Sequence, residues 1–556
     1  MKRILLFLFL LTGIISLSAQ NFHWARTMGG SSNDLARWVA NDLSGNTYIT
    51  GTFSETADFD PGSASFNISS AGMIDIFIAK LDGQGNFLWA KNIGAAGNEE
   101  VRSITTDASG NIILTGYFDG TVDFNPGSGS FKLTATGADM FVLKLDGQGN
   151  FIWAIKAGGS SSDIGLGIAV DRKKNVYVTG VYFNTVDFDP GPSNAYLTSI
   201  GSSDVFISKY DSAGGFLWAK SVGDTGIEWG NAIAVDSVGN VFVTGQFQKA
   251  VDFDPGISKH YIATIGFADA FILKLNSSGG FEWAKKIGGT AGGSTGTMGF
   301  SIAVNRKGQV YSTGTFIGTI DFDPGTAKSE LTSAGLAKDV YVLKLENNGE
   351  FAWAKKFGAS LEEDVRSVVV DMTGNVYLTG SFQTTLTFGA TMLKSNGTLD
   401  VFVVAFDDAG NFKWGQNFGG TGVDFGYASS VDAWGNVFTT GTFSGTVDFD
   451  PSATILSLAT KGATDAFVTK LSPKSVDIKN IAAPHFSICP NPSPGKFTIT
   501  NNIEISEIEL FNSLGQSILK MYPDEKNVVL NVTQYGLYFI KLTVDNSIFT
   551  KKIMVE

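Results

Sequence analysis

Acidic residues recur at one equivalent position along this chain of 556 residues. Each lies eight residues before the acid or amide that ends a short apolar segment. The seven occurrences, six of them acidic, are Asp34, Glu99, Asp163, Glu228, Thr297, Glu363 and Asp424. If the segments are strands around one axis, these carboxylates form a ring near the mouth of a channel and attract a cation or basic ligand. The alternative is that each acid accepts N–H groups of its own loop or pairs with a nearby arginine.

Three residues further on, the side chains differ between the repeats. This second set is Arg37, Arg102, Leu166, Asn231, Phe300, Arg366 and Tyr427. A residue identical in every repeat is expected to serve the scaffold, whereas a specific binding surface should lie where the repeats diverge. The candidate binding residues are therefore the six acids together with Arg37, Arg102 and Arg366.

A second acidic pattern is the phrase Asp-Phe-Asp-Pro-Gly, which begins at Asp58, Asp187, Asp252 and Asp321. In an extended segment its two acids share one face and could give Ca²⁺ two oxygens. Ca²⁺ takes about six to eight oxygen ligands, so Ca²⁺ is only weakly supported. The phrase also fits a turn in which Pro sets φ and Asp bonds the backbone. The sequence favours the turn and implies no cofactor.

Motifs for catalysis are scarce. The three histidines, His23, His260 and His485, lie far apart, and Cys489 is the single cysteine, so neither a disulfide nor a Cys/His zinc cluster can form within the chain. A glycan-active hydrolase or lyase that uses the channel-mouth carboxylates is one alternative. A hydrolase needs one specific pair of carboxylates, however, and a near-symmetric ring singles out none. Enzymatic activity is therefore the less favoured interpretation.

The elements that must position these residues follow a repeat. The phrase Phe-x-Trp occurs seven times, with tryptophans 61 to 70 residues apart, at Trp24, Trp89, Trp153, Trp218, Trp283, Trp353 and Trp414. Between them the second repeat predicts four short strands, at 101–107, 112–118, 139–145 and 151–157, separated by Asp/Gly/Asn turns. Four antiparallel strands per repeat are typical of a β-propeller blade.

The two ends of the repeat region complement each other. Residues 21–28 predict a fourth strand with no strands before it, and residues 465–471 predict a third strand with none after it. Paired, they complete a seventh blade, so residues 20–471 are predicted to form an all-β, seven-bladed β-propeller closed by its N-terminal strand. The aspartates that begin the third strands are interpreted as acceptors of backbone N–H groups, and the repeated tryptophans as core. These aspartates are Asp75, Asp139, Asp204, Asp269, Asp339, Asp400 and Asp465.

The repeats resemble the bacterial seven-bladed β-propeller (SBBP) repeat family over about residues 21–471. The phrases that carry the resemblance are Asp-x-Phe-x-x-Lys-Leu-Asp, Gly-Asn-Phe-x-Trp and Val-Asp-x-x-Gly-Asn-Val-Tyr-Val-Thr-Gly. The resemblance implies the fold and no single activity.

The N-terminus has the pattern of a secretory signal. Lys2 and Arg3 precede the apolar run 4–15, and small residues follow, so cleavage is predicted before Gln20 and residues 1–19 form the signal peptide. No later apolar run is long enough to span a membrane. Residues 472–486 lack the repeat and are interpreted as a linker, and the short alternating strands of 487–556 predict a small β-sandwich.

The C-terminal segment also resembles the type A C-terminal sorting domain of the Bacteroidetes type IX secretion system. The positions that carry this resemblance are Pro490, Asn491, Pro492, Gly495, Leu514, Gly515, Gly536, Tyr538 and Lys541. The resemblance implies the type IX secretion machinery as a partner. It also implies export through the periplasm, removal of the tail, and a final location in the medium or on the outer-membrane surface.

The overall charge narrows the classes of ligand. A formal charge of −13 and a pI near 4.8 argue against nucleic acid and anionic lipid. The leading hypothesis is a secreted or cell-surface module that binds a glycan, peptide or protein through its loops. A purely structural surface or matrix protein is the other alternative. Because the fifth and sixth repeats depart most from the pattern, an asymmetric site is expected beside them.

Overall fold

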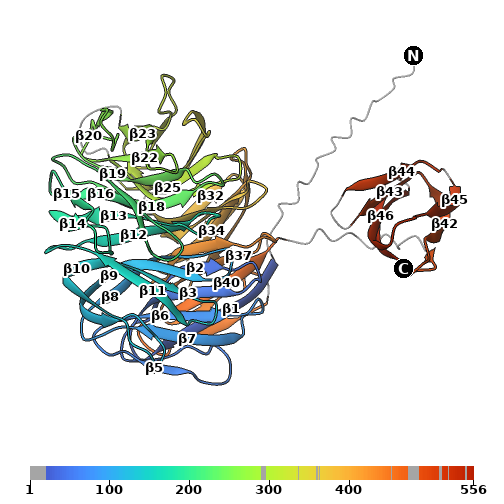
Figure 1. Cartoon of the computed structure of the whole chain (residues 1–556), viewed down its shortest axis with the longest axis horizontal. Helices are drawn as coiled ribbons and strands as arrows, with labels where there is room; N and C mark the ends of the chain where they lie inside the picture. Colours follow the sequence, from blue (N-terminus) through green and yellow to red (C-terminus); the bar gives the residue numbers. More distant parts are fainter. Residues whose placement is uncertain are drawn as a thin grey trace, which may run out of the picture. The chain divides into compact units, whose positions relative to one another are not determined.

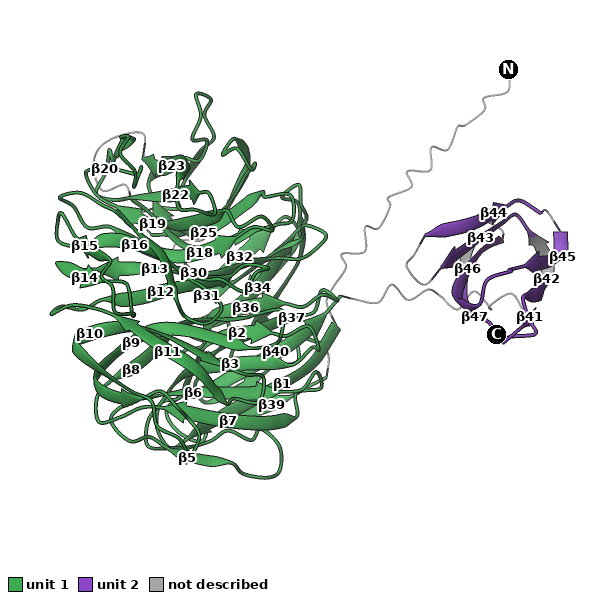
Figure 2. Ribbon diagram, viewed as in Figure 1, with its two compact units in different colours: residues 1–473 green, residues 474–556 purple. Residues whose placement is uncertain are grey.

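The computed structural model describes residues 21–289, 296–335, 337–358, 361, 363–452, 454–473, 487–512, 516–523, 525–544 and 547–556. The predicted signal peptide, residues 474–486 of the predicted linker, and Leu514 and Gly515 lie outside these ranges. The chain divides into two compact units, residues 1–473 and 474–556 (Figure 2).

The described part of the first unit is all-β and antiparallel, and it contains seven sheets whose four main strands follow one order (Figure 1). In each sheet the strands that we call first, second, third and fourth lie side by side. Sheet 1 is β2 (Leu35–Asn41), β3 (Thr47–Phe53), β6 (Asp75–Leu81) and β7 (Phe87–Ile93); sheet 2 is β8 (Glu99–Thr106), β9 (Ile112–Asp123), β10 (Lys132–Leu145) and β11 (Phe151–Ala157). Sheet 3 is β12 (Ile164–Val170), β13 (Val176–Tyr182), β16 (Asp204–Tyr210) and β17 (Phe216–Val222); sheet 4 is β18 (Trp229–Val235), β19 (Val241–Phe247), β22 (Asp269–Leu275) and β23 (Phe281–Gly289). Sheet 5 is β24 (Gly296–Val304), β25 (Val310–Ile317), β28 (Asp339–Leu345) and β29 (Phe351–Phe357); sheet 6 is β30 (Glu363–Val370), β31 (Val376–Phe382), β34 (Asp400–Phe406) and β35 (Phe412–Phe418).

Sheet 7 joins the two ends of the repeat region. Its strands are β36 (Phe425–Val431), β37 (Val437–Phe443), β40 (Asp465–Ser472) and β1 (Asn21–Gly30). β1 pairs antiparallel with β40 from Asn21 opposite Ser472 to Met28 opposite Ala466. This is the pairing that the orphan strands of the sequence predict.

Local turn chemistry explains why each hairpin forms. After β2, one carboxylate oxygen of Asp42 accepts the backbone N–H groups of Ser44 and Asn46, both at 2.9 Å. Gly45 has a φ of +83°, which glycine adopts without steric cost. The same Asp-x-x-Gly-Asn phrase, with the same hydrogen bonds, recurs at many of the other tight turns, such as 107–111 and 371–375, so these turns are encoded within a few neighbouring residues.

The core lies between the sheets. The second and third strands are the most buried, and β3 and β6 are buried along their whole length, whereas first and fourth strands are buried in part. Each first strand packs against the first strand of the next sheet, and β36 of sheet 7 packs against β2 of sheet 1.

The Asp-Phe-Asp-Pro-Gly phrases lie in small hairpins beside the sheets. In sheet 2 this hairpin is the continuation of β9 and β10. Elsewhere it is a pair of short strands, which extends the sheet of β1 in one case and that of β23 in another, and forms a separate two-stranded sheet in four cases. The pairs are β4 (Thr56–Asp58) with β5 (Asn67–Ser69), β14 (Thr185–Asp187) with β15 (Tyr196–Thr198), β20 (Ala250–Asp252) with β21 (Tyr261–Ala263), β26 (Thr319–Asp321) with β27 (Glu330–Thr332), β32 (Thr385–Phe388) with β33 (Thr391–Lys394), and β38 (Thr446–Asp448) with β39 (Ser457–Ala459).

Neighbouring sheets are joined by a repeated hydrogen-bond latch. In sheet 1, Nε1 of Trp89 and Nζ of Lys80 both donate to the backbone oxygen of Gly147 in sheet 2, at 3.3 and 2.8 Å. Trp24 and Lys470 of sheet 7 donate in the same way to Gly83 of sheet 1, at 3.3 and 2.9 Å. Of the seven tryptophans, Trp24 and Trp414 are buried as predicted, and the other five are partly exposed, at positions from which an indole can reach the next sheet.

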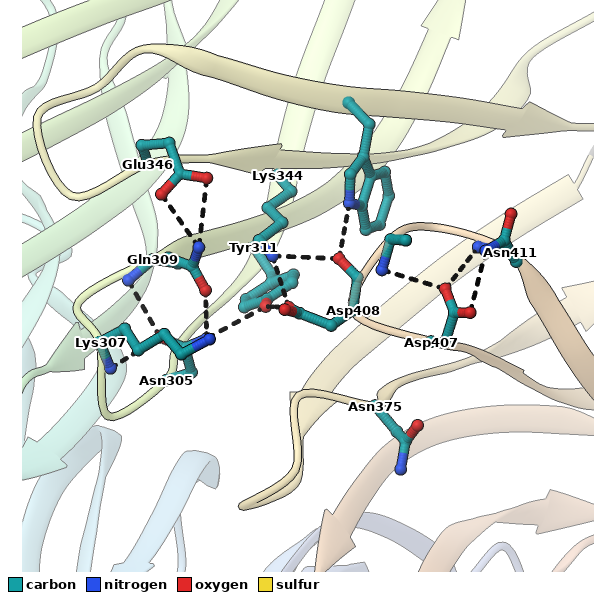
Figure 3. Close-up of polar contacts among 12 residues, drawn as sticks. Asn305, Lys307, Gln309, Tyr311, Lys344, Glu346, Asn375, Asp407, Asp408 and Asn411 are labelled. Carbon is teal, nitrogen blue, oxygen red and sulfur yellow. Dashed lines mark hydrogen bonds and ion pairs between the residues drawn. The ribbon is translucent and has the colours of Figure 1, made fainter.

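The latch between sheets 5 and 6 is the most polar variant (Figure 3). Asn305 replaces the aspartate that ends the other first strands, and Asp408 of sheet 6 supplies a carboxylate instead. Asp408 pairs with Lys344 and accepts the hydroxyl of Tyr311 at 2.7 Å, while its backbone oxygen accepts Nε1 of Trp353 at 3.0 Å. A carboxylate from the next sheet thus compensates for the one lost from the sheet itself.

The second unit contains two antiparallel sheets with one hydrophobic core. One sheet holds β41 (Ser487–Cys489), β42 (Lys496–Ile505) and β45 (Glu525–Asn531); the other holds β44 (Ser517–Met521), β43 (Glu507–Asn512), β46 (Gly536–Val544) and β47 (Ser547–Val555). Phe497, Ile508 and Ile540 are among its fully buried side chains. Within the described ranges of the whole chain, no helix has the length and hydrophobicity of a membrane span.

Candidate functional site

The structure buries the recurring acids at the contacts between sheets. All seven side chains at this position are at most 2% exposed, and none lines the central cavities described below. Glu99 accepts the N–H of Ala95 at 3.0 Å, and Asp163 accepts those of Gly159 and Phe183 at 2.7 and 2.9 Å. Asp34, Glu228 and Asp424 accept N–H groups of their own loops in the same way. These carboxylates therefore hold loops in place, which is the structural alternative that the sequence left open.

Each recurring acid lies near the aspartate that begins the third strand of the preceding sheet. Asp75 accepts the N–H of Ala71 at 3.0 Å, as predicted for this aspartate. Its carboxyl group packs against Gly94, where a Cβ atom would lie 2.1 Å from the Cγ of Asp75. Equivalent glycines and aspartates meet in all seven sheets, so this glycine is needed for space.

Burial changes the protonation of these acids. Loss of hydration, together with the nearby charge of Asp75, raises the pKa of Glu99 to about 7. The same causes raise the pKa of Asp34 and Glu228 to about 7 and that of Asp424 to about 6. The pKa of Asp163 is also raised by burial, but here Lys156 lies close and opposes the shift, and it pairs with Asp139.

The residues three positions later have a different environment, because each lies at a register shift in its first strand. In sheet 1, Ala36 pairs with Gly51 and Trp38 with Thr50, which leaves Arg37 as the extra residue of a β-bulge. The same shift brackets the equivalent residue in every other sheet: Arg102, Leu166, Asn231, Phe300, Arg366 and Tyr427. A bulge redirects a side chain and is common beside functional sites.

All seven bulge residues line one cavity of about 560 Å³, which we call the rim cavity. The described residues that complete its lining are Trp38, Trp229, Gln246, Met298 and Phe425. The structure therefore brings Arg37, Arg102 and Arg366 together and separates them from the six acids. The sequence analysis did not identify these five additional lining residues; three of them, Trp229, Met298 and Phe425, directly follow a residue of the recurring acidic position.

The arginines of the rim cavity are held by acids outside its lining. Glu100 accepts from Nη2 of Arg102 at 2.6 Å, from the hydroxyl of Tyr117 at 2.8 Å, and lies 3.3 Å from Nη2 of Arg37. Arg366 pairs with Asp364 at 2.6 Å. Aromatic rings support the guanidinium groups: Arg37 lies 5.5 Å from the ring centre of Tyr427, and Arg366 lies 5.2 Å from that of Phe300. No described residue that lines this cavity is Asp or Glu.

Two further cavities adjoin the rim cavity. The axial cavity, about 420 Å³, is lined by residues of all seven first strands and shares Leu166, Asn231 and Phe300 with the rim cavity. The lateral cavity, about 450 Å³, lies between sheets 7 and 1 and shares Phe425 and Tyr427 with it. The sequence predicted an asymmetric site beside the fifth and sixth repeats. The lateral cavity is lined by residues of sheets 7 and 1 instead. Residues 290–295 of the fifth repeat lie outside the described ranges.

The Asp-Phe-Asp-Pro-Gly phrases form turns, as the sequence favoured. Oδ1 of Asp58 accepts the N–H groups of Asp60 and Phe66 at 3.1 and 2.9 Å, and Asp60 accepts that of Gly62 at 2.8 Å. Phe59 is fully buried. Within the described residues no group of three or more Asp, Glu, His or Cys side chains is placed to hold a metal ion.

The Pro-Asn-Pro segment of the second unit holds its last strand. Nδ2 of Asn491 donates to the backbone oxygen of Lys552, and its Oδ1 accepts the N–H of Met554, both at 2.9 Å. Gly495 has a φ of +109°, a conformation that favours glycine. Tyr538 is buried and donates its hydroxyl to the backbone oxygen of Gln534 at 2.9 Å. Of the other positions in this motif, Pro490 and Pro492 flank Asn491, Gly536 begins β46, and Lys541 lies 3.6 Å from Glu509.

Residues 487–556 match the family of the secretion system C-terminal sorting domain. This domain directs a protein to the type IX secretion machinery. The chain is therefore exported through type IX secretion to the cell surface or the extracellular space.

Similarity over the repeats is more distant. The chain is 23% identical over 437 residues to an uncharacterized WD repeat-containing protein of Acanthamoeba polyphaga mimivirus, which covers 65% of this chain and 31% of that protein. It is 27% identical over 197 residues to the regulatory protein FlaEY of Caulobacter vibrioides, covering 35% and 19%. The chain thus spans less than a third of the length of these curated relatives.

Among solved structures, the chain is similar to PorZ, described as a surface component of the type IX secretion system of Porphyromonas gingivalis. The identity is 10%, with 95% of this chain and 99% of that chain covered, and the TM-score is 0.16. A TM-score this low does not establish a shared overall fold.

Proposed function

We propose that this protein is a secreted or cell-surface binding module built on a closed seven-bladed β-propeller of the SBBP repeat type. Seven equivalent four-stranded sheets support this, as do the pairing of β1 with β40 and the axial cavity lined by all seven first strands. The likeness to a WD repeat-containing protein agrees with it, because WD repeats form propeller blades.

The binding site in this proposal is the rim cavity, with Arg37, Arg102 and Arg366 as binding residues. The observation that carries it is the gathering of all seven bulge residues, which differ from repeat to repeat, around one cavity. A scaffold alone would give seven equivalent strands no reason to differ there. A pocket with aromatic walls and a few polar groups is the usual form of a ligand site.

The two alternatives have less support. A hydrolase acting through the recurring carboxylates needs acids that a substrate can reach, whereas all six are buried and five of them accept N–H groups of their own loops. A purely structural protein would need no cavity at which the repeats diverge.

A binding screen tests the proposal. The secreted protein is applied to a panel of glycans and peptides beside the variant Trp229→Ala, which removes an indole that is 36% exposed and lines the rim cavity. We expect saturable binding of at least one member and a loss of about tenfold or more in the variant. A binding affinity that neither Trp229→Ala nor Arg366→Gln changes would contradict this site.

We further propose the domain division 1–19 signal peptide, 20–471 propeller, 472–486 linker and 487–556 sorting domain, with removal of the sorting domain after export. Deletion of residues 487–556 should trap a folded propeller in the periplasm. Immunoblots of periplasm and medium, with a melting curve of the trapped protein, test this. Appearance of the truncated protein in the medium would contradict the assigned sorting role.

A further inference from the structure

The rim cavity is basic in an acidic protein. The chain carries a formal charge of −13, yet the lining of this cavity includes three arginines and no described acid. Arg37 and Arg102 share the single carboxylate of Glu100, so these two arginines and one glutamate together carry one excess positive charge. A cavity with this lining attracts an anion, and the net negative charge of the chain disfavours a ligand of high charge density.

Hydrogen-bond donors without acceptors lie at the same place. Nε of Arg37, Nε of Arg102 and Nε1 of Trp38 are each buried and have no hydrogen-bond partner among the described residues. Buried donors nearly always find an acceptor, because an unmade bond to a buried donor is costly. Their gathering at one cavity is an observation independent of the charge, and it also indicates a ligand rich in oxygen atoms.

Aromatic and amide groups supply the rest of the recognition surface. The rings of Phe425 and Tyr427 lie parallel within 14°, with centres 5.9 Å apart, and Trp229 is partly exposed. Asn231 keeps its amide oriented by donating to the backbone oxygen of Gly299 at 2.8 Å. Flat rings fit the apolar C–H face of a sugar, and amides and guanidinium groups fit its hydroxyls and carboxylates.

The length of the site favours an oligomer over a single ion. Phe425 and Tyr427 line both the rim cavity and the lateral cavity, so these two rings border both spaces. The rim cavity alone has a volume of about 560 Å³. This space accommodates several rings of a chain.

We propose that the rim cavity binds an acidic oligosaccharide whose sugar rings carry carboxylates, with Arg37, Arg102 and Arg366 contacting the carboxylates and Phe425 and Tyr427 contacting the ring faces. This inference rests on the proposed function and names its class of ligand. A uronic acid oligomer spaces single negative charges by one sugar ring each. That spacing suits separate arginines and an aromatic surface better than a densely charged polymer does.

The test uses the full secreted protein and three probes: a uronic acid tetrasaccharide, the same tetrasaccharide with its carboxylates reduced to alcohols, and an acidic peptide of equal charge. Affinity is measured by calorimetry at two salt concentrations. We expect the uronic acid probe to bind at least about tenfold more tightly than its reduced form, with affinity falling as salt rises.

Variants locate the interaction. Arg366→Gln, at a half-exposed position, should weaken binding of the uronic acid probe about tenfold while leaving the melting temperature unchanged. Arg172→Gln changes an exposed arginine of a distant turn and is the matched control. The double variant Arg37→Gln with Arg102→Gln should abolish binding, and its melting curve reports whether the unpaired Glu100 disturbs the fold.

The outcomes separate this inference from the proposed function. Equal binding of both tetrasaccharides, still lost in Trp229→Ala, would overturn the anionic ligand and keep the binding site. Binding of the peptide alone would overturn the glycan assignment in favour of an acidic protein partner. Tight binding of the uronic acid probe that is insensitive to all arginine variants would overturn the location. No binding of any probe, together with a negative panel, would overturn both proposals.

Discussion

Two sets of residues, three positions apart in the same seven strands, have opposite environments. The first set, represented by Glu99, is buried at the contact between sheets and is acidic in six repeats of seven. The second set, represented by Arg102, lies at a β-bulge, lines the rim cavity and varies from repeat to repeat. Repetition therefore marks what every sheet needs in order to pack, and divergence marks the surface that is free to become specific.

The glycine beside each buried aspartate belongs to the repeated class. Gly94 leaves room for the carboxyl group of Asp75, and the same pair occurs in every one of the seven sheets. The aspartates of these pairs resemble functional residues in the sequence, because they are acidic and occur in every repeat. Their hydrogen bonds show that they are structural.

The largest effect should follow removal of β1. Deleting residues 21–28 strips β40 of its partner, removes the buried Trp24 and Met28, and breaks the latch to Gly83. The expected loss is comparable with the whole stability of a domain, about 5–15 kcal/mol, so no cooperative melting transition should remain. A normal melting curve for the truncated protein would refute closure by β1.

A smaller but still severe effect is expected for Gly94→Ala. The added Cβ would lie 2.1 Å from the buried carboxyl carbon of Asp75, so the backbone after the fourth strand must shift or the acid must lose its N–H bonds, at a cost of about 3 kcal/mol. Urea unfolding measures it. Gly83→Ala is the control, because its nearest neighbour lies at 3.4 Å, and equal losses for the two variants would argue against crowding at Asp75.

Stability should depend on pH through the buried acids. Asp34, Glu99, Glu228 and Asp424 have pKa values raised to about 6 or 7 in the folded protein, so they hold protons that the unfolded chain releases above about pH 4. Their contribution to stability is fully present below the unfolded pKa and is lost as pH rises through about 7. The melting temperature should therefore fall between pH 5 and pH 8.

The same experiment distinguishes two kinds of sheet contact. Glu99→Gln should reduce the loss of unfolding free energy between low and neutral pH by roughly 2 kcal/mol, because its neighbour Asp75 has no lysine beside it. Asp163→Asn should flatten it less, because Lys156 already compensates for the charge at that contact. An equal change in the two variants would show that burial alone, without the lysine, sets the titration.

The smallest effect on stability is expected in the divergent set. Arg366 is half-exposed and pairs with a partly exposed Asp364, so Arg366→Gln should change the free energy of unfolding by less than about 1 kcal/mol. Urea unfolding beside Gly94→Ala makes the contrast direct. A loss as large as that of Gly94→Ala would place the bulge residues in the scaffold and remove the distinction between the two sets.

Much of the fold was predictable because it is encoded locally. Asp42, Asn46 and a glycine with positive φ specify a turn within five residues, and alternation of apolar and polar side chains specifies the strands beside it. Repetition then marks equivalent strands, and the orphan strands 21–28 and 465–471 predict each other. The sorting motif was also predictable from the sequence, because Asn491 and its flanking prolines are consecutive in the chain.

The sequence by itself determined the repeat, the strands, the turns and the equivalence of residues such as Arg37, Arg102 and Arg366. Only the tertiary structure decided which equivalent set faces a cavity. A β-bulge at each of these residues shifts the register of the first strand. No local sequence pattern predicts the bulge, because Ala36 and Trp38 are as compatible with a regular strand as with a bulged one. The direction of each side chain depends on how first strands that are distant in the sequence pack against one another, and that information exists only in the folded chain.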